Sequence, residues 1–178
     1  MKSHGIKRNK QGKQYVLVVI KPDGMSKALV GPILEKFFAT KLELIAARVL
    51  EVSRKLAEEH YRHIKGQPFY EQTLGVMQGK FYKQKRVLAL ILCGPDAIRK
   101  CRIVAGATNP KEADPRSVRG TFGRVTRDGI YENVVHASSD PKEAEREIKL
   151  WFSPDQFDTK IFPIKKSANG RQHKMVWA

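Results

Sequence analysis

The residue of this sequence with the clearest capacity for covalent chemistry is His136. It ends a short apolar segment that starts at Asn133, and small polar residues follow it over 137–140. A histidine between the end of a strand and the start of a helix lies at the edge of a sheet, where ligands commonly bind. Imidazole is a good nucleophile and exchanges protons near neutral pH. A strand-end histidine can also be an ordinary packed residue, so its role depends on the rest of the chain.

Several side chains elsewhere in the sequence could bind a polyphosphate. Lys21 follows the first apolar segment, Arg102 lies after the third, and Thr108 and Arg119 lie in the connection beyond it. Arginine offers two donors at once to a phosphate. No Gly-x-x-x-x-Gly-Lys-Ser/Thr loop and no Gly-x-Gly-x-x-Gly turn after a strand is present, so side chains would have to hold the phosphates. Each cation taken alone could equally be a solvated surface charge.

A nucleophilic imidazole needs one ring nitrogen free and the other held by an acceptor. Glu147 lies within the helix predicted after His136 and could reach back to it. The alternative is that Glu147 is a surface carboxylate that pairs within its own helix.

Composition limits the class of protein. The chain has 178 residues and is 41% hydrophobic, which allows a sizeable core in one domain, or two at most. Its net charge of +16 favours phosphate-bearing partners such as nucleotides, nucleic acid or anionic lipid. Half of this charge lies in the two ends. We therefore predict a basic flexible arm over 1–13, a central domain over 14–153 and a basic C-terminal extension over 154–178.

Cys93 and Cys101 are the two cysteines of the chain, too few for a disulfide framework. Both read as small buried hydrophobic residues, which predicts a reducing, cytoplasmic location. No apolar run approaches the ~18 residues of a membrane span.

The order of the predicted elements indicates the fold. Apolar segments predict buried strands over 15–20, 44–52, 87–93 and 133–136. Helices are predicted over 30–38, 53–64 and 69–77, from Gly94-Pro95 to Gly106, and over 140–152. The segments between them predict a turn over 21–24, a basic loop over 79–86, a long connection over 107–132 and a polar tail beyond 153. This pattern is typical of the α/β class, and more closely of an α+β sandwich with ferredoxin-like βαββαβ order. We therefore expect a four-stranded antiparallel sheet with helices on one face.

Five motifs occur in a fixed order along the chain. They are Tyr15-Val-Leu-Val-Val-Ile-Lys-Pro-Asp-Gly24; His60-Tyr61 with Lys65-Gly-Gln-Pro-Phe69; Arg102 with Gly106-Ala-Thr-Asn-Pro110; Arg119-Gly-x-Phe122; and Asn133-Val-Val-His136 with Glu145-Arg-Glu147. Together they resemble the nucleoside diphosphate kinase family over about residues 14–153.

The resemblance implies a ping-pong transfer of the γ-phosphate from a nucleoside triphosphate to a nucleoside diphosphate through a phosphohistidine. It implies His136 as the nucleophile, Glu147 as the residue that orients it, and Lys21 as a further catalytic residue. Phe69 would stack on the base, and the remaining nucleotide-binding residues would be Lys21, Tyr61, Arg102, Thr108, Arg119 and Asn133. It also implies Mg²⁺ bound mainly through the nucleotide phosphates, with no protein metal ligand assigned, and a homo-oligomer, either a hexamer or a tetramer.

The sequence departs from the family pattern close to the expected nucleophile. The usual His-Gly-Ser-Asp is His136-Ala-Ser-Ser139, which lacks the carboxylate that helps to position Mg²⁺ through water. The usual Arg-Gly-Asp-Phe is Arg119-Gly-Thr-Phe122. Extra residues occur around 80–86 and around 124–132.

The sequence also fits two alternatives. The charge of +16 also fits a catalytically weak or inactive kinase-like module that binds nucleic acid or another polyanion through its basic ends. His60 and His63 stand three residues apart on a predicted helix and could chelate a metal, although no third ligand is near in sequence.

Overall fold

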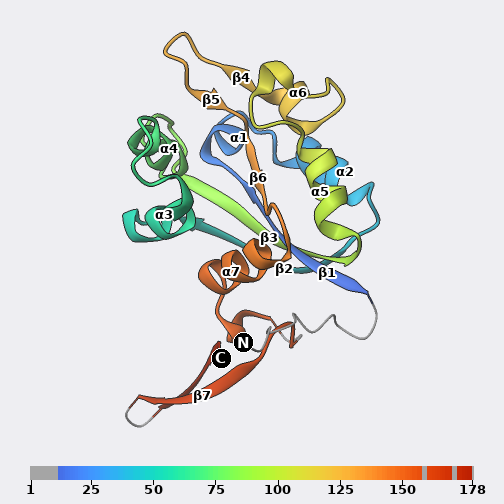
Figure 1. The fold of residues 1–178 in the computed structure, drawn as a ribbon, viewed down its shortest axis with the longest axis vertical. Helices are drawn as coiled ribbons and strands as arrows, with labels where there is room; N and C mark the ends of the chain where they lie inside the picture. Colours follow the sequence, from blue (N-terminus) through green and yellow to red (C-terminus); the bar gives the residue numbers. More distant parts are fainter. Residues whose placement is uncertain (1–11, 158–159, 170–171, 178) are drawn as a thin grey trace, which may run out of the picture.

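A four-stranded antiparallel sheet forms the centre of the molecule, as predicted. The computed structural model describes residues 12–157, 160–169 and 172–177, so the predicted arm over 1–13 lies almost wholly outside the described residues. The sheet consists of β1 (Lys13–Ile20), β2 (Glu43–Glu51), β3 (Arg86–Pro95) and β6 (Val135–Ala137). Their spatial order is β2-β3-β1-β6, and each neighbouring pair is antiparallel (Figure 1). This is the order of a ferredoxin-like βαββαβ sandwich.

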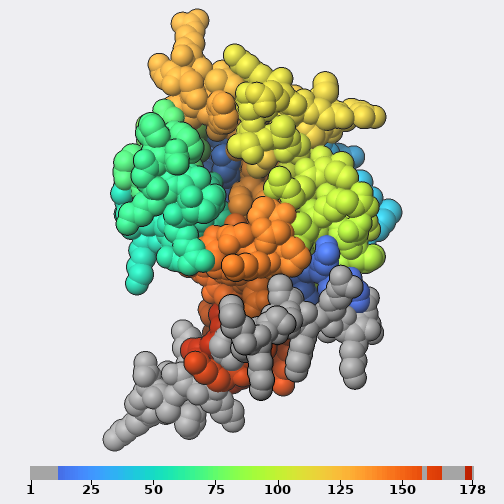
Figure 2. Space-filling view, viewed as in Figure 1, coloured from blue at the N-terminus to red at the C-terminus, as the bar shows by residue number. Residues whose placement is uncertain are grey.

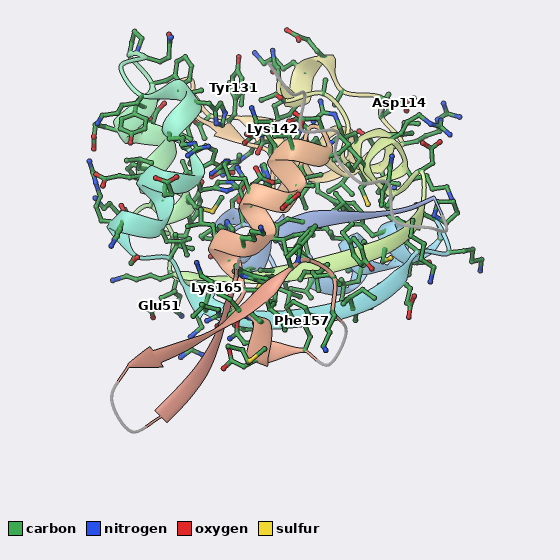
Figure 3. All side chains as sticks on the ribbon, turned by 60° about the horizontal axis from the view of Figure 1, so that its bottom comes forward. Glu51, Asp114, Tyr131, Lys142, Phe157 and Lys165 are labelled. Atoms are coloured by element: carbon green, nitrogen blue, oxygen red, sulfur yellow. The ribbon has the colours of Figure 1, made fainter. Side chains whose placement is uncertain are left out.

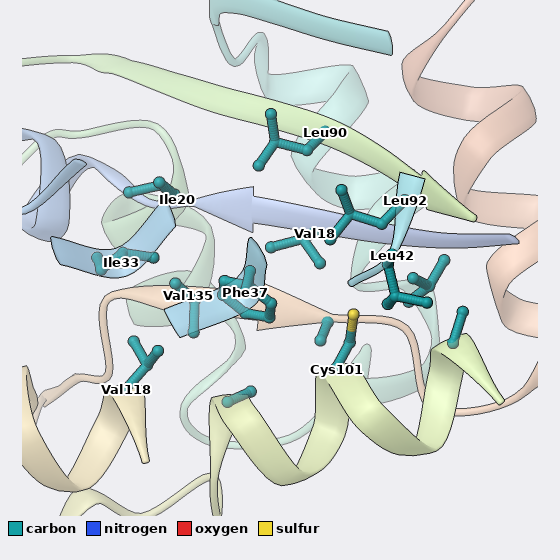
Figure 4. Packing of buried hydrophobic residues seen from close by; sticks show 14 of the residues in the cluster. Val18, Ile20, Ile33, Phe37, Leu42, Leu90, Leu92, Cys101, Val118 and Val135 are labelled. Carbon is teal, nitrogen blue, oxygen red and sulfur yellow. The ribbon is translucent and has the colours of Figure 1, made fainter. Parts of the chain in front are cut away.

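The helices cover both faces of the sheet, which corrects the prediction of one covered face. Val16, Val18 and Ile20 of β1 belong to the core on one face, and Leu17 and Val19 to the core on the other. The first core includes residues of α2 (Val30–Phe38) and α5 (Ala97–Ala105), as Figure 4 shows. The second includes residues of α3 (Arg54–His60), α4 (Tyr70–Met77) and α7 (Pro141–Trp151). Because both faces are buried, β1 reads as a continuous apolar run.

Three predicted helix ends are confirmed by their hydrogen bonds and backbone angles. Ser53 Oγ accepts from the Leu56 N–H at the start of α3. Asp140 Oδ1 accepts from the N–H groups of the second and third residues of α7, each at 2.9 Å. Gly106 ends α5 with a φ of 86°, which favours glycine. The helix predicted through residue 64 is too long, because α3 ends at His60 and a separate 3-10 turn spans Arg62–Ile64.

Two predicted boundaries near the ends of the central strands are wrong. The turn predicted over 21–24 is part of a short helix, α1 (Pro22–Ser26). Gly94 and Pro95 do not start α5, because β3 continues through them and pairs with the first residues of β1. The chain then turns at Asp96, which has a φ of 60°, and α5 begins at the next residue.

The connection over 107–132 contains more regular structure than predicted. It includes a 3-10 turn (Pro110–Glu112), the short helix α6 (Val118–Phe122), and a hairpin of β4 (Arg124–Val125) and β5 (Tyr131–Glu132). The fourth strand of the sheet starts two residues later than predicted, because Val134 has a φ of 56° and cannot be in extended backbone.

The residues beyond 153 do not form a featureless polar tail. They include a 3-10 turn (Pro154–Gln156) and an antiparallel hairpin of β7 (Ile164–Asn169) and β8 (Gln172–Trp177). The Trp177 ring packs near Phe157 and Phe162, and its Nε1 donates to the Phe152 carbonyl at 2.8 Å. The extension therefore contacts the residue that follows α7.

Cys93 and Cys101 are buried and free, as the sequence indicates. Among the described residues, none of the helices has the length and apolar character that crossing a membrane requires.

Candidate active site

One cavity of about 870 Å³ brings together all the residues predicted to act on a nucleotide. It is lined by Lys21, Tyr61, Phe69, Arg102, Thr108, Arg119, Asn133, His136 and Glu147. Figure 2 shows the surface hollowed between the region of α3 and α4 and the region of α5 and α6. Residues that are far apart in sequence therefore share one site.

The His136 ring is held on one side by a carboxylate. Its Nε2 lies 3.0 Å from Glu147 Oε2, and its side chain is 18% exposed at the cavity. Glu147 is buried on α7 and also accepts a 2.6 Å hydrogen bond from Ser138 Oγ. Because a carboxylate only accepts, Nε2 carries the proton and Nδ1 is the ring nitrogen with a free electron pair. The prediction that Glu147 reaches back to His136 agrees with this geometry.

Glu147 remains ionised despite its burial. Burial alone would raise the pKa of its carboxyl, but His136, His60 and the Ser138 hydroxyl favour the charged form and lower the pKa to about 2. Ser138 is itself fixed, because its Oγ accepts from the Leu17 N–H of β1 at 3.1 Å. β1 thus holds Ser138, Ser138 orients the Glu147 carboxylate, and that carboxylate orients the His136 imidazole.

His60 belongs to this cluster, although the sequence indicated only a possible metal ligand. Its ring is fully buried at 4.4 Å from the His136 ring, with an angle of 79° between the two planes. His60 Nδ1 accepts from Trp151 Nε1 at 3.1 Å. Burial is the main cause that lowers the pKa of His60 well below its usual value, and the neighbouring His136 adds to this effect. His60 is therefore neutral and supports the nucleophile by contact.

His60 and His63 do not lie on one helix, which corrects the placement assumed for a chelating pair. His60 is the last residue of α3, whereas His63 is exposed in the following 3-10 turn. The hydrogen-bond partner of His60 is Trp151 on α7. The sequence spacing of His60 and His63 could not predict this contact, because Trp151 is distant in sequence.

The cations of the cavity lie close enough to affect one another. Lys21 is 5% exposed, and burial and the charge of Arg119 lower its pKa. Arg119 donates to the Gly106 carbonyl at 2.8 Å and to the Val135 carbonyl at 3.0 Å. Burial and the charge of Arg102 lower the pKa of Arg119 to about 10. Three positive side chains therefore line the cavity beside His136, which favours a polyanionic ligand.

Asn133 and Thr108 are linked across the cavity wall. Asn133 Nδ2 donates to the Thr108 carbonyl at 2.8 Å, so β6 and the connection after α5 are held together. The backbone N–H and carbonyl of the next residue, Val134, both form hydrogen bonds with the segment around α1. Its N–H donates to Asp23 Oδ2 at 2.9 Å, and its carbonyl accepts from the Lys21 N–H at 2.8 Å.

The carboxylates of the site are largely engaged by other groups. His60, His136 and Glu147 offer ligand atoms within 4.8 Å of one another, but each already takes part in a hydrogen bond within the cluster or to Trp151. Asp140 caps α7 and accepts from Ser139 Oγ at 2.7 Å. Ser139 and Glu143 line the cavity, and Glu143 pairs with Arg146 at 2.7 Å. The chain offers few carboxylates to a metal ion here.

A ferredoxin-like fold whose cavity contains an imidazole, its carboxylate and three cations defines a phosphotransferase. Residues 14–157 match the family described as nucleoside diphosphate kinase. The nucleoside diphosphate kinase of Thermococcus kodakarensis is 37% identical over 157 residues, which cover 88% of this chain and 84% of that protein.

Solved structures agree with this match. The nucleoside diphosphate kinase of Aquifex aeolicus is 31% identical with a TM-score of 0.73, over 82% of this chain and 99% of that chain. The enzyme of Borrelia burgdorferi, solved as a transition-state mimic with vanadate and ADP, is 28% identical with a TM-score of 0.73, over 84% of this chain and 92% of that chain. The chain belongs to the nucleoside diphosphate kinase family.

Proposed function

We propose that this phosphotransferase transfers the γ-phosphate of a nucleoside triphosphate to a nucleoside diphosphate through a phosphohistidine on Nδ1 of His136. The observation that carries this proposal is the 3.0 Å contact between His136 Nε2 and Glu147, which leaves Nδ1 as the ring nitrogen with a free electron pair in a cationic cavity. The family of the chain supports the overall reaction.

In the first half-reaction, the Nδ1 electron pair forms a bond to the γ-phosphorus. The bond between that phosphorus and the bridging oxygen breaks, and the electrons leave with the nucleoside diphosphate. The proton on Nε2 stays in place, and the Glu147 carboxylate offsets the positive charge that develops on the ring. In the second half-reaction, an oxygen of the acceptor diphosphate attacks the phosphorus and the bond to Nδ1 breaks.

The other cavity residues would bind the nucleotide. Lys21, Arg102 and Arg119 would neutralise the phosphates, since phosphoryl transfer depends mainly on positioning and charge. Tyr61, Thr108 and Asn133 would contact phosphate or ribose through hydroxyl and amide groups. Phe69 would stack on the base without reading its edges, so we expect weak discrimination between bases.

Mg²⁺ would be bound mainly through the phosphates of the nucleotide. The donor set fits this arrangement, because Glu147 and Asp140 take part in other hydrogen bonds and Glu143, which lines the cavity, pairs with Arg146. When bound, Mg²⁺ would neutralise and orient the phosphates while keeping several of its waters.

The first prediction concerns the covalent intermediate. The protein mixed with γ-labelled ATP and Mg²⁺, without an acceptor, should become labelled on a group that is labile in acid and stable in base. The variant His136→Ala should take up essentially no label, because it lacks the attacking nitrogen. The variant Lys55→Ala serves as the control, since Lys55 is exposed and does not line the cavity. Unchanged labelling of His136→Ala would contradict the proposal.

We further propose a homo-oligomeric enzyme, a hexamer or a tetramer, that acts in the cytoplasm. Leu44 and Val49 support association, because they are 44% and 55% exposed on β2, which is an edge strand of the sheet. The free thiols of Cys93 and Cys101 support a reducing compartment, which cell fractionation would test.

A second candidate role, contact with nucleic acid or another polyanion through the basic ends, is favoured by the net charge of +16. Deleting the extension is a poor test, because Trp177 bonds to the carbonyl that follows α7. Charge reversal at the exposed Lys165 is preferable, and a polyanion affinity that neither this change nor added salt alters would argue against the role.

A further inference from the structure

The C-terminal end of α7 is held by two residues from distant parts of the chain. The last carbonyls of a helix have no partner inside the helix and must be satisfied from outside. Arg48 of β2 donates from Nη1 to the Trp151 carbonyl at 2.9 Å, and its charge complements the negative end of the helix dipole. Trp177 of β8 donates from Nε1 to the Phe152 carbonyl at 2.8 Å. Both donors therefore fix the same turn of α7.

An aromatic cluster fixes Trp177 in this position. The centre of its six-membered and five-membered ring system lies 5.9 Å from the ring centres of Phe157 and Phe162. The Phe162 ring in turn lies 5.9 Å from the ring of Tyr15 on β1. Figure 3 shows the β7–β8 hairpin at the end of α7 that is away from Lys142. The base of the hairpin is therefore packed onto the sheet and onto the segment that follows α7.

The turn of α7 that is held in this way carries the groups that restrain the nucleophile. Glu147 precedes Trp151 by one helical turn, so their side chains lie on the same face of α7. Glu147 lies 3.0 Å from the His136 ring nitrogen. Trp151 is buried and donates to His60, whose ring lies against that of His136. A shift of this end of α7 would therefore displace both neighbours of the nucleophile together.

The cations that would bind the phosphates are on other elements. Lys21 precedes α1, Arg102 is on α5 and Arg119 is on α6. Neither Arg48 nor Trp177 lines the cavity. A change at the end of α7 should therefore act on the rate of transfer and leave the affinity for the nucleotide unchanged.

We propose that Arg48 and Trp177 are positioning residues for phosphoryl transfer. They hold the end of α7 and thereby keep Glu147 on the His136 ring. This inference rests on the proposed function and extends it to the C-terminal hairpin, because Trp177 lies beyond residues 14–157, the part that matches the family. The hairpin then acts on catalysis from outside the cavity.

The test measures phosphoenzyme formation by rapid quench over a range of concentrations of γ-labelled ATP with Mg²⁺. Trp177→Phe keeps an aromatic ring and removes the donor, and Arg48→Met keeps the aliphatic stem and removes the charge. Each should lower the maximal rate by about 10-fold, because small displacements of catalytic groups are costly, and leave the half-saturating ATP concentration unchanged. Arg48→Lys keeps a cationic donor and should recover most of the rate.

A double variant and two controls separate positioning from a general loss of stability. Arg48→Met combined with Trp177→Phe should lose less than the product of the separate losses, because either change already releases the helix end. Lys36→Met removes a hydrogen bond of the same kind and length, from a cation to a backbone carbonyl, at a residue that does not line the cavity. Val176→Ala changes the opposite face of β8. Both controls should keep the parent rate.

The free energy of unfolding in urea completes the comparison. An unchanged maximal rate in Trp177→Phe and Arg48→Met, with or without a loss of unfolding free energy, would overturn the inference. A rate loss of the same size in Lys36→Met, or losses that multiply in the double variant, would also overturn it. Failure of the parent protein to form phosphoenzyme would instead overturn the proposed function.

Discussion

Glu147 and His60 restrain the His136 ring in different ways. Glu147 bonds to Nε2 and carries a charge, whereas His60 touches the ring and stays neutral. A positively charged side chain in the position of His60 would repel the imidazolium-like ring that forms during transfer. The combination of one charged and one neutral neighbour therefore suits a nucleophile that becomes positive when it reacts.

The neutrality of His60 gives a prediction about stability at low pH. Its pKa is lowered in the folded protein, so the unfolded chain, with a histidine pKa of about 6.5, binds the proton first. His60 should therefore destabilise the fold as the pH falls below about 6.5, by up to roughly 1.4 kcal/mol per pH unit. The variant His60→Gln should show a shallower loss of unfolding free energy between pH 7.5 and 5.5 in urea titrations.

The variant His60→Asn provides the comparison for this experiment. It should show the same shallow slope as His60→Gln, because both replace the imidazole by a side chain that does not titrate. The same slope in His60→Gln and in the parent would show that His60 does not govern the acid sensitivity.

At the scale of the elements, β6 depends on an unfavourable backbone conformation two residues before His136. A valine with a φ of 56° costs about 1–3 kcal/mol, and its surroundings must impose it. Asp23 and the Lys21 N–H hold Val134 on both sides. Helix α1 therefore determines where the nucleophile lies.

Asp23→Ala should disturb both stability and catalysis. It would leave the buried Val134 N–H without its acceptor, so we expect the unfolding free energy to fall by about 2 kcal/mol. Displacement of β6 should also lower kcat by roughly 10-fold or more. Asp23→Asn keeps an acceptor oxygen and should lose less in both denaturant titrations and turnover assays. Equal behaviour of the two variants would argue against a role for this hydrogen bond.

The elements that were predicted correctly are those whose signal is local. The apolar run of β1, the cap at Asp140 and the glycine at 106 each act within a few residues. The errors arose where a partner sets the boundary. β3 extends through Gly94 and Pro95 because these residues pair with the start of β1 at Lys13. β6 is shorter than predicted because a hydrogen bond to α1 holds Val134 outside the strand. Sequence patterns do not contain these tertiary contacts.

The same limit applies to the site: residues that belong to sequence motifs were predicted, and residues whose place depends on a tertiary contact were not. Ordered motifs identified the residues from Lys21 to Glu147 that the structure gathers in one cavity. His60 was not assigned, because its place in the cluster depends on a contact with Trp151 that is distant in sequence.

At the scale of the whole molecule, β2 is an edge strand that exposes Leu44 and Val49, which suits self-association. We expect sedimentation analysis to show a homo-oligomer, and Val49→Lys to shift it toward smaller species, because a lysine on an edge strand opposes pairing. Phe81→Lys, a change at another exposed apolar residue, should leave the distribution unchanged. A parent protein that sediments as a monomer would contradict the oligomer.

The mutual effect of Lys21, Arg102 and Arg119 has a consequence beyond catalysis. Burial and like charge lower the pKa values of Lys21 and Arg119, and at Lys21 the carboxylates of Asp23 and Glu132 offset only part of this effect. A bound nucleotide would add negative charge beside these cations, and ligands that bind the folded chain stabilise it in proportion to the logarithm of their concentration. The resistance of this enzyme to unfolding and proteolysis should therefore rise and fall with the nucleotide supply of the cell.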